Sequence, residues 1–191
     1  MAARRTPLTR ADILTTALRI VDDEGVDALS MRRLARELGI EAMSLYHHFE
    51  NKDAILAGII DLALEAEAPG AGAAPPTSWR DPVAAAVLGF RRVLVKHPNV
   101  LPVMAAHPPV SGSSTVYIQG PLQYLIARGL SETDATDLFQ GVFALAFGHA
   151  MLSTSYGSIE LADAPPVEFT EESFTRTLSV VLDGYEPHPG E

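Results

Sequence analysis

The chain has 191 residues, of which 47% are hydrophobic, so it can bury a substantial core; it has no cysteine, which excludes disulfides and thiolate metal sites. Its formal net charge is −10, but residues 1–53 carry eight Lys/Arg against nine Asp/Glu, so most of the excess acid lies in residues 54–191. This distribution argues against a protein that coats nucleic acid generally, while it allows a local positive surface near the N-terminus.

The first residues lack the apolar segment of a signal peptide, and the most apolar stretch, 142–152, is too short to span a bilayer. We therefore expect a cytoplasmic protein that makes no use of a membrane.

Helix signals dominate the sequence, and no stretch alternates in the manner of a strand, so we predict an all-α fold. Thr9 is expected to cap a first helix that ends at Gly25, and Ser30 a second helix that ends at Gly39. Two helices joined by the short segment "LGIE" are typical of a helix-turn-helix, in which the second of the pair enters the DNA major groove.

A short third helix is predicted from about Ala42 to His48, and Asn51 is expected to cap a fourth. Leu45 and Phe49 are four residues apart and share one face, so we expect them to anchor the third helix to the small domain. The residues around them, including two adjacent histidines, then face outward; adjacent side chains diverge too far on a helix to chelate one metal ion.

Two neighbouring helix starts carry cations where carboxylates are normally favoured. The second helix opens with Ser30, Met31, Arg32 and Arg33, and the fourth opens with Lys52 directly after its cap. A cation there costs a few tenths of a kcal/mol unless an external anion compensates, and DNA phosphates are suitable anions.

Residues 68–77, "APGAGAAPPT", are predicted to form a linker or long loop. Beyond them we expect an apolar, proline-punctuated stretch at 98–110, a loose loop after residue 155, and four helices. The predicted helices cover residues 79–97, 114–128, 132–155 and 171–184.

The run "ILTTALRIVDDEGVDALSMRRLARELGI", followed by "EAMSLYHHFENKDAIL", resembles the tetracycline repressor (TetR) family, whose signature combines Leu-Tyr, a variable residue, an aromatic or His, Phe and, after a short gap, Lys. The resemblance implies a homodimer whose N-terminal three-helix domains bind a palindromic double-stranded DNA operator. The residues that it places at the DNA, largely at phosphates, are Ser30, Arg32, Tyr46, His47, His48 and Lys52; Arg33 joins them through the charge pattern above.

The resemblance also implies that Met43 and Ser44 occupy the positions that face the bases. Because Ala42, Met43 and Ser44 offer little hydrogen-bonding capacity, we expect contact with thymine methyl groups plus one hydroxyl, helped by Arg32.

The second half resembles the tetracycline repressor-like C-terminal domain through "SWRDP", "KHP" and "RGLSETDA", without a counterpart of the ligand set for metal-bound tetracycline. The predicted organisation is a DNA-binding domain at 1–53, a connecting helix at 54–67, the linker at 68–77, and an effector-binding and dimerisation domain at 78–191.

Effector pockets are mostly apolar with a few polar groups, and one set of residues in the second half offers this mixture. Its members are Phe90, Leu94, Met104, His107, Tyr117, Tyr124, Phe143, Phe147 and His149. Each aromatic taken singly is more often core than ligand contact. His107 has no second His or carboxylate three or four residues away, so no metal site is predicted.

The last two long helices carry apolar stripes that could form half of a four-helix bundle across a two-fold axis. The stripe residues predicted for this dimer interface are Phe139, Val142, Ala146, Phe174, Leu178, Val181 and Leu182. An intramolecular core alone is the alternative for the same residues.

Together these features predict a ligand-responsive transcriptional regulator, expected to be a repressor that a small, mostly apolar effector releases from DNA by shifting the population of two conformations. No cofactor is predicted, and enzyme motifs such as G-x-S-x-G, H-E-x-x-H, a P-loop or a dinucleotide fingerprint do not occur. A small-molecule-binding dimer that acts independently of DNA is the alternative.

Overall fold

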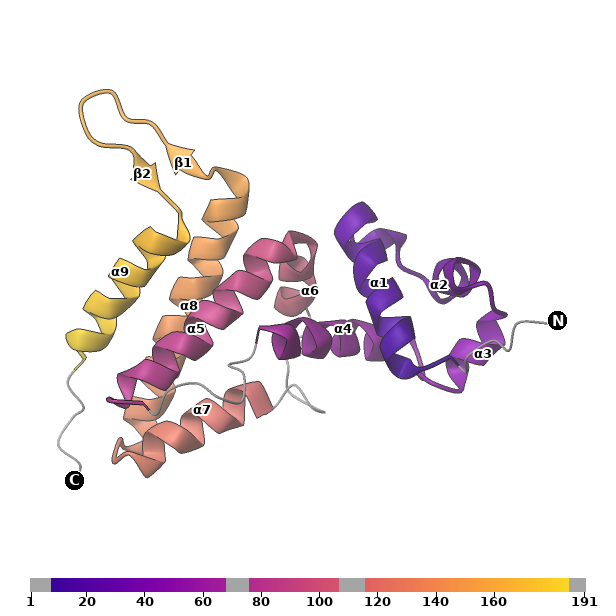
Figure 1. Cartoon of the computed structure of the whole chain (residues 1–191), viewed down its shortest axis with the longest axis horizontal. Coiled ribbons are helices and arrows are strands. Elements are labelled where there is room, and N and C mark those ends of the chain that lie inside the picture. The colour runs from indigo at the N-terminus through magenta and orange to yellow at the C-terminus, as the bar shows by residue number, and fades with distance from the viewer. Residues whose placement is uncertain (1–7, 68–75, 107–115, 186–191) are drawn as a thin grey trace.

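The computed structural model describes residues 8–67, 76–106 and 116–185. Nine α-helices and one small hairpin lie within these ranges, so the predicted all-α class is confirmed. The molecule is elongated, with the N-terminal helices at one end and the C-terminal helices at the other (Figure 1).

Four helices form the N-terminal end. They are α1 (Arg10–Glu24), α2 (Met31–Leu38), α3 (Ala42–Tyr46) and α4 (Lys52–Ala66), with a 3₁₀ turn at Val26–Ala28 between α1 and α2. The predicted caps are present: the side chain of Thr9 forms a capping box with Asp12, and the hydroxyl of Ser30 accepts from the backbone N–H of Arg33. Gly39 ends α2 in the left-handed conformation, at φ 66°, which favours glycine. The predicted third helix is two residues shorter than expected, because His47 already caps it.

Five helices form the other end. They are α5 (Arg80–Lys96), α6 (Leu101–Ala106), α7 (Val116–Ala127), α8 (Glu132–Ser155) and α9 (Glu171–Asp183). α5 and α8 run side by side and α9 packs against both, while α4 extends from the N-terminal helices toward α5 (Figure 1). Within the described residues no helix is both long enough and apolar enough to cross a membrane.

Two segments differ from the sequence prediction. The stretch expected to be an apolar, proline-punctuated segment contains a 3₁₀ turn, Pro98–Val100, followed by α6. Pro98 and Pro102 stand in the first turns of these helical segments, where a missing N–H is tolerated. The expected loose loop after α8 forms an antiparallel hairpin of β1 (Ser158–Ile159) and β2 (Val167–Glu168). Most of the predicted linker, residues 68–75, lies outside the described residues.

The core crosses the expected domain boundary. The largest cluster of buried side chains joins residues from α1 to α4 with Val93 of α5, Val100 and Val103. A second cluster lies between α5, α7, α8 and α9, and a small third one surrounds Leu94 and Ala150. The N-terminal helices therefore share a hydrophobic interior with the part of the chain that follows the linker.

Candidate nucleic-acid interface and effector site

The helix-turn-helix is formed by α2 and α3, and two buried side chains fix the second helix. Leu45 is fully buried and Phe49 nearly so, as their spacing predicted. Arg10, from the start of α1, adds a clamp that the sequence did not reveal: its guanidinium lies 4.0 Å from the centre of the Phe49 ring and donates to the carbonyl of His48. The C-terminal end of α3 and the residues that follow it are thus held against the domain.

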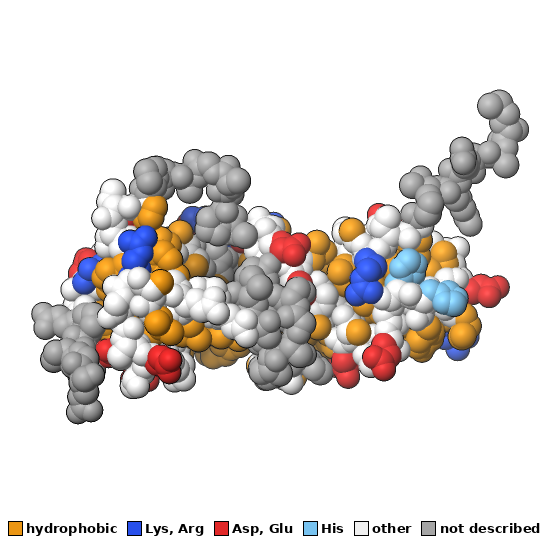
Figure 2. Space-filling view, turned by 90° about the horizontal axis from the view of Figure 1, so that it is seen from below, with side chains coloured by type: hydrophobic (Ala, Val, Ile, Leu, Met, Phe, Trp, Pro, Cys, Tyr) orange, Lys and Arg blue, Asp and Glu red, His pale blue; other side chains and the backbone are white. Residues whose placement is uncertain are grey.

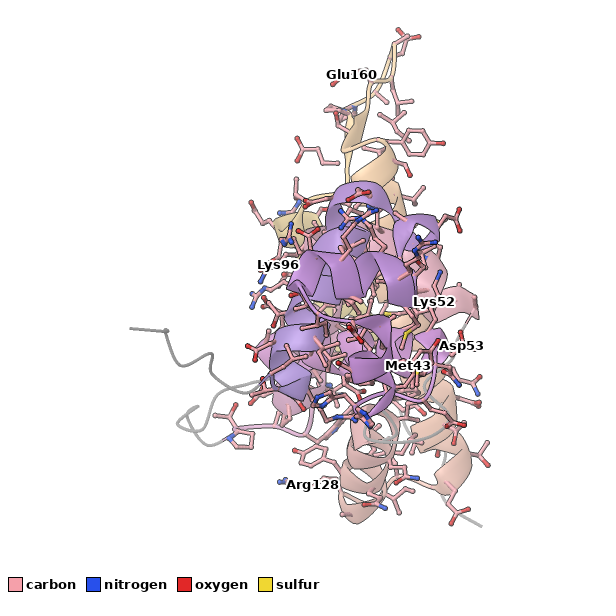
Figure 3. The ribbon with its side chains drawn as sticks, turned by 90° about the vertical axis from the view of Figure 1, so that its right-hand side faces the viewer. Met43, Lys52, Asp53, Lys96, Arg128 and Glu160 are labelled. Atoms are coloured by element: carbon pink, nitrogen blue, oxygen red, sulfur yellow. The ribbon has the colours of Figure 1, made fainter. Side chains whose placement is uncertain are left out.

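The outer face of α3 is exposed. Met43 is 68% exposed and Tyr46 49%, which is high for large apolar side chains; His47 is exposed too, while Ser44 and His48 are half-buried. Met43 and Lys52 lie on the same end of the molecule (Figure 3), and histidine side chains gather beside a basic residue at that end (Figure 2). Apolar, hydroxyl and cationic groups thus share one solvent-facing surface.

The two arginines at the start of α2 differ in their surroundings. The first turn of α2 contains no acid, and Arg32 is exposed, with no ion pair within the described part of the chain. Arg33, by contrast, donates to Glu37 and, at 2.8 Å, to Glu24, and these bonds raise its pKa. Arg19 and Arg33 together lower the pKa of Glu37 to about 2. Arg33 therefore has carboxylate partners inside the domain, where it links α1 and α2, and its predicted contact with DNA phosphates stays a prediction.

Lys52 also has a partner that its position in the sequence did not indicate. Its half-buried ammonium donates, at 3.0 Å, to the carbonyl of Val26 in the 3₁₀ turn before Ser30. The lysine thus ties the start of α4 to the turn that leads into α2, and its remaining N–H donors stay available for an anion.

Aromatic rings form a row between α5 and α8. The Phe90 and Phe143 rings lie 4.9 Å apart, and Phe139 stacks on Phe143 at 4.3 Å. Phe147 lies one turn further along α8, half-buried beside Leu94, which is fully buried. Phe139, which was predicted at a dimer interface, is half-buried and stacks on a ring of its own chain, and its place at an interface stays a prediction.

The other residues predicted to line the pocket lie in different surroundings. Met104 of α6 is half-buried and packs against two core clusters, and Tyr124 of α7 has a buried hydroxyl without a hydrogen-bond partner among the described residues. His149 does not join the row, because it stands on the opposite side of α8 and contacts α9. His107 lies outside the described residues, and Tyr117 is described only as a member of α7.

Most of the predicted dimer residues are covered by their own chain. The residues concerned are nearly or fully buried: Val142, Ala146, Phe174, Leu178 and Leu182. They join α5 and α7 in one core cluster, so the intramolecular alternative holds for them. Val181, at 38% exposed, keeps an open surface. A sequence stripe marks a buried face without showing which chain covers it, and this was the source of the error.

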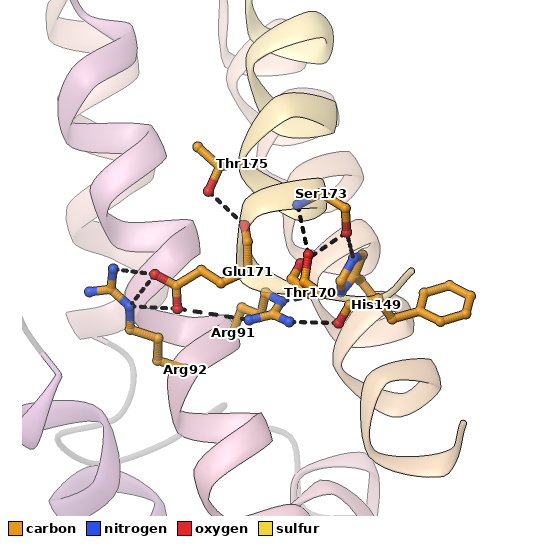
Figure 4. Close-up of polar contacts among 8 residues, drawn as sticks. Arg91, Arg92, His149, Thr170, Glu171, Ser173 and Thr175 are labelled. Atoms are coloured by element: carbon orange, nitrogen blue, oxygen red, sulfur yellow. Dashed lines mark hydrogen bonds and ion pairs between the residues drawn. The ribbon is translucent and has the colours of Figure 1, made fainter. Parts of the chain in front are cut away.

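A buried polar cluster that the sequence did not reveal connects α5, α8 and α9 (Figure 4). Arg91 is only 3% exposed; its Nε donates to Nδ1 of His149 and its Nη2 to the carbonyl of Phe169, each at 3.1 Å. His149 also lies 3.4 Å from the hydroxyl of Ser173. Burial and the nearby Arg91 charge lower the pKa of His149. Glu171 accepts three hydrogen bonds from Arg92, which lower the pKa of its carboxyl.

The described residues contain no group of three or more His, Cys, Asp or Glu side chains placed to hold a metal ion.

Comparison with known proteins shows to which family a chain with this arrangement of helices belongs. Residues 13–59 match the family of bacterial regulatory proteins called tetR, and residues 71–160 match the tetracyclin repressor-like C-terminal domain. The chain belongs to the TetR family. An HTH-type transcriptional regulator from Saccharopolyspora erythraea is 33% identical over 80% of this chain and 60% of its own length. The class C tetracycline repressor from Escherichia coli is 26% identical over 91% of this chain and 76% of its own length.

Solved TetR-family structures share the fold. ActR from Streptomyces coelicolor, in complex with actinorhodin, is 31% identical, covers 81% of this chain and 70% of its own, and superposes with a TM-score of 0.66. BioQ, solved with its double-stranded DNA operator, is 25% identical over 93% of this chain and 97% of its own, also with a TM-score of 0.66. TetR-family membership makes this chain a ligand-responsive transcriptional regulator with a helix-turn-helix DNA-binding domain, and not an enzyme.

Proposed function

We propose that this TetR-family regulator is a cytoplasmic repressor that binds a palindromic operator as a homodimer and is released by a small, flat, mostly apolar effector. The observation that carries the proposal is the outer face of α3: it exposes Met43 and Tyr46 while Leu45 and Phe49 hold the helix from behind. Two large side chains exposed on one face of a helix that is anchored from behind suit a surface that contacts a partner.

On DNA, α3 enters the major groove. Met43 contacts thymine methyl groups, and the hydroxyl of Ser44 supplies a hydrogen bond to a base edge. Phosphate contacts come from the rim of the same surface. We assign them to the residues Ser30, Arg32, Tyr46, His47, His48 and Lys52, and we assign none to Arg33, because two carboxylates occupy it.

The effector binds beside the aromatic row of Phe90, Phe139 and Phe143. Rings spaced 4.3–4.9 Å apart on two helices offer edges and faces to a flat aromatic guest, and Phe147 and Met104 extend the apolar surface. The buried hydroxyl of Tyr124 is a polar group that the guest can satisfy. ActR, which binds actinorhodin, supports the choice of an aromatic effector class.

The homodimer forms through the outward faces of α8 and α9. Met151 is 50% exposed and Val180 73%, and together with Val181 they leave apolar surface open on both helices. Exposed Ala144 and Gly141 on α8 allow a partner helix to approach closely.

A gel-shift titration with the DNA that flanks the protein's own gene tests the repressor. We expect a specific, salt-sensitive shift for the wild type and a weaker one in Tyr46→Ala and Arg32→Ala. The slope of log binding constant against log salt concentration should become shallower in Arg32→Ala, by about 1 for each phosphate contact that is lost. Arg176→Ala is the matched control, because Arg176 is an exposed arginine on α9 that pairs only with Glu172 among the described residues. Absence of a specific shift, or an equal shift in all variants, contradicts DNA binding by α3 and favours the DNA-independent dimer.

A thermal-shift screen of flat aromatic compounds, with actinorhodin as the first probe, tests the effector site. A true effector raises the melting temperature, and at one hundred times its dissociation constant it stabilises the protein by roughly 2.7 kcal/mol. It also removes the gel shift, because it prefers the conformation that does not fit DNA. Phe143→Ala is expected to reduce both effects; a ligand that stabilises Phe143→Ala as strongly as the wild type binds elsewhere.

A further inference from the structure

The C-terminal end of α1 carries the wrong charge for its position. A helix C-terminus is electronegative, yet the last residues of α1 are Asp22, Asp23 and Glu24, and its last turn contains no basic residue. Arg19 approaches Asp23 at 3.8 Å and Arg33 pairs with Glu24, so these two acids are compensated from within the N-terminal helices. Asp22 has no cationic partner there among the described residues.

The partner of Asp22 comes from the other side of the linker. Nδ1 of His97 lies 2.8 Å from a carboxylate oxygen of Asp22, across 75 positions of sequence. The side-chain amide of Asn99 donates to the carbonyls of Val21 and Asp22, both at 3.0 Å. Both carbonyls lie in the last turn of α1, and that of Val21 also accepts from the backbone N–H of Gly25. Residues 97–100, which we call the junction turn, therefore add side-chain donors to the end of α1 from the other side of the linker.

Apolar contacts reinforce this polar cap. Val100, at the end of the junction turn, is fully buried, and Val103 on α6 nearly so, within the same core as Ile13, Ala17 and Val21 of α1. The turn is therefore packed as well as hydrogen-bonded against α1, and α1 is held by the effector part of the chain along its C-terminal half.

The junction turn lies between the two functional surfaces. It follows α5, which carries Phe90 of the aromatic row, and it leads into α6, which carries Met104. On the other side, α1 runs into the 3₁₀ turn where Lys52 binds Val26, immediately before the Ser30 cap of α2. A displacement of the end of α5 thus has a packed, hydrogen-bonded route to the helix-turn-helix that does not pass through α4.

We infer that His97 and Asn99 are positioning residues that fix the orientation of the helix-turn-helix relative to the effector-binding helices. The role of this orientation in operator release rests on the proposed function, whereas the orientation itself does not. Among the described residues, α4 is the covalent connection, Val93 of α5 packs into the N-terminal core, and the junction turn adds a polar attachment at α1. Loss of the junction turn is expected to let the N-terminal helices swing about α4.

The absence of cysteine allows a direct test on the full chain. Cysteines introduced at the exposed positions Glu50 and Glu132 can carry spin labels, and the labelled chain is mixed with an excess of unlabelled chain so that only distances within one chain are read. We expect a narrow distance distribution in the otherwise wild-type chain, and a broadened or displaced one in Asn99→Ala and in His97→Ala. Asn99→Asp should be at least as disturbed, because a carboxylate cannot donate to the two carbonyls and stands beside Asp22.

Two controls separate positioning from general destabilisation. Thr170→Ala removes the N-cap of α9 and should lower the melting temperature without changing the distance distribution. Gln123→Ala, an exposed position on α7, should change neither. An unchanged distribution in the folded double variant His97→Ala/Asn99→Ala overturns the inference.

The operator found by gel shift gives the functional arm of the test. We expect Asn99→Ala to lower operator affinity by about fivefold or more, since coupling between sites is typically of this size. A chain that binds no DNA contradicts the proposed function but leaves the distance measurement intact. Normal operator affinity together with a broadened distance distribution overturns the functional consequence and leaves the positioning role in place.

Discussion

Single side chains decide how the recognition helix is held and what it can offer to DNA. Arg10 stacks on Phe49 and donates to the carbonyl of His48, so one exposed arginine closes the turn between α3 and α4. Sequence reasoning found Leu45 and Phe49 because their spacing is local, but Arg10 lies 38 positions from His48, and its role depends on how α1 crosses α3. The partners of Arg33 were missed for the same reason.

Arg10→Ala should therefore loosen α3 as well as lower stability. We expect a loss of about 1–2 kcal/mol in the free energy of unfolding from the exposed cation–π contact and the hydrogen bond, measured by chemical denaturation. Operator affinity should fall further than in Arg10→Lys, which keeps the charge but lacks the planar guanidinium. Equal operator affinities for the two variants would show that only the charge of Arg10 matters.

Whole elements were predicted where their caps and periodicity are local. The starts of α1, α2 and α4 follow the predicted caps to the residue, because in each the side chain of the cap accepts from the backbone N–H only three residues later. The hairpin was missed because strands of two residues are too short to show alternation. His149 was assigned to the pocket by composition, whereas its place opposite the aromatic row follows from the rotation of α8 in the bundle.

The polar cluster around His149 should make the stability of the packing between α5, α8 and α9 depend on pH and fall in acid. The pKa of His149 is lowered in the folded protein, so the unfolded chain binds its proton more readily; stability is complete above pH 6.5 and falls as the pH drops below it. Arg91 is the cation that opposes protonation, and Glu171 is the nearby acid. We expect the melting temperature to fall between pH 7.5 and pH about 5.5.

His149→Gln should flatten this dependence, because the amide can still accept from Arg91 and donate to Ser173 without binding a proton. A wild-type curve as flat as that of His149→Gln would contradict the assignment. The comparison is made above pH 5, where Glu171, the acid of this cluster, stays ionised because its carboxyl pKa is lowered.

Gly89 sets how closely α4 approaches α5. A Cβ at this buried position would lie 2.8 Å from the backbone carbonyl oxygen of Glu67, so Gly89→Ala forces the backbone to shift. We expect it to lose about 1–3 kcal/mol of unfolding free energy in a urea titration. Gly120→Ala is the control: no atom lies within 4 Å of its added Cβ, and replacing a helical glycine by alanine should leave stability unchanged or raise it by up to about 1 kcal/mol.

At the scale of the whole molecule, the sequence could identify the regulator but not the residues of the surface that we propose for a dimer. The stripes on α8 and α9 were correctly read as buried, yet Phe174, Leu178 and Leu182 are covered within the chain. What stays open is the opposite side of the same two helices, where Ala144, Val180 and Val181 lie. Periodicity contains no information on which of two apolar sides a partner takes.

Light scattering at micromolar concentration should give twice the chain mass for the wild type and the monomer mass for Ala144→Arg/Val180→Glu. The double variant should also lose operator affinity, because two half-sites are no longer bound together. Ile126→Glu, which places a charge on an exposed apolar residue of α7, should remain dimeric. If all three proteins form dimers of equal strength, the dimer interface does not lie on the outward faces of α8 and α9.

The N-terminal helices share a hydrophobic interior with the segment from Val93 to Val103. This shared interior matters when the DNA-binding domain of such a regulator is fused to the effector-binding domain of another. A biosensor built by fusing residues 1–67 to a foreign effector module would keep the operator preference but present α1 with an unmatched neighbour. Transplanting the recognition unit together with the side chains of residues 93–103 that touch it keeps its stability and its responsiveness. The unit to be grafted therefore includes residues from both sides of the linker, so it is not defined by a single boundary in the sequence.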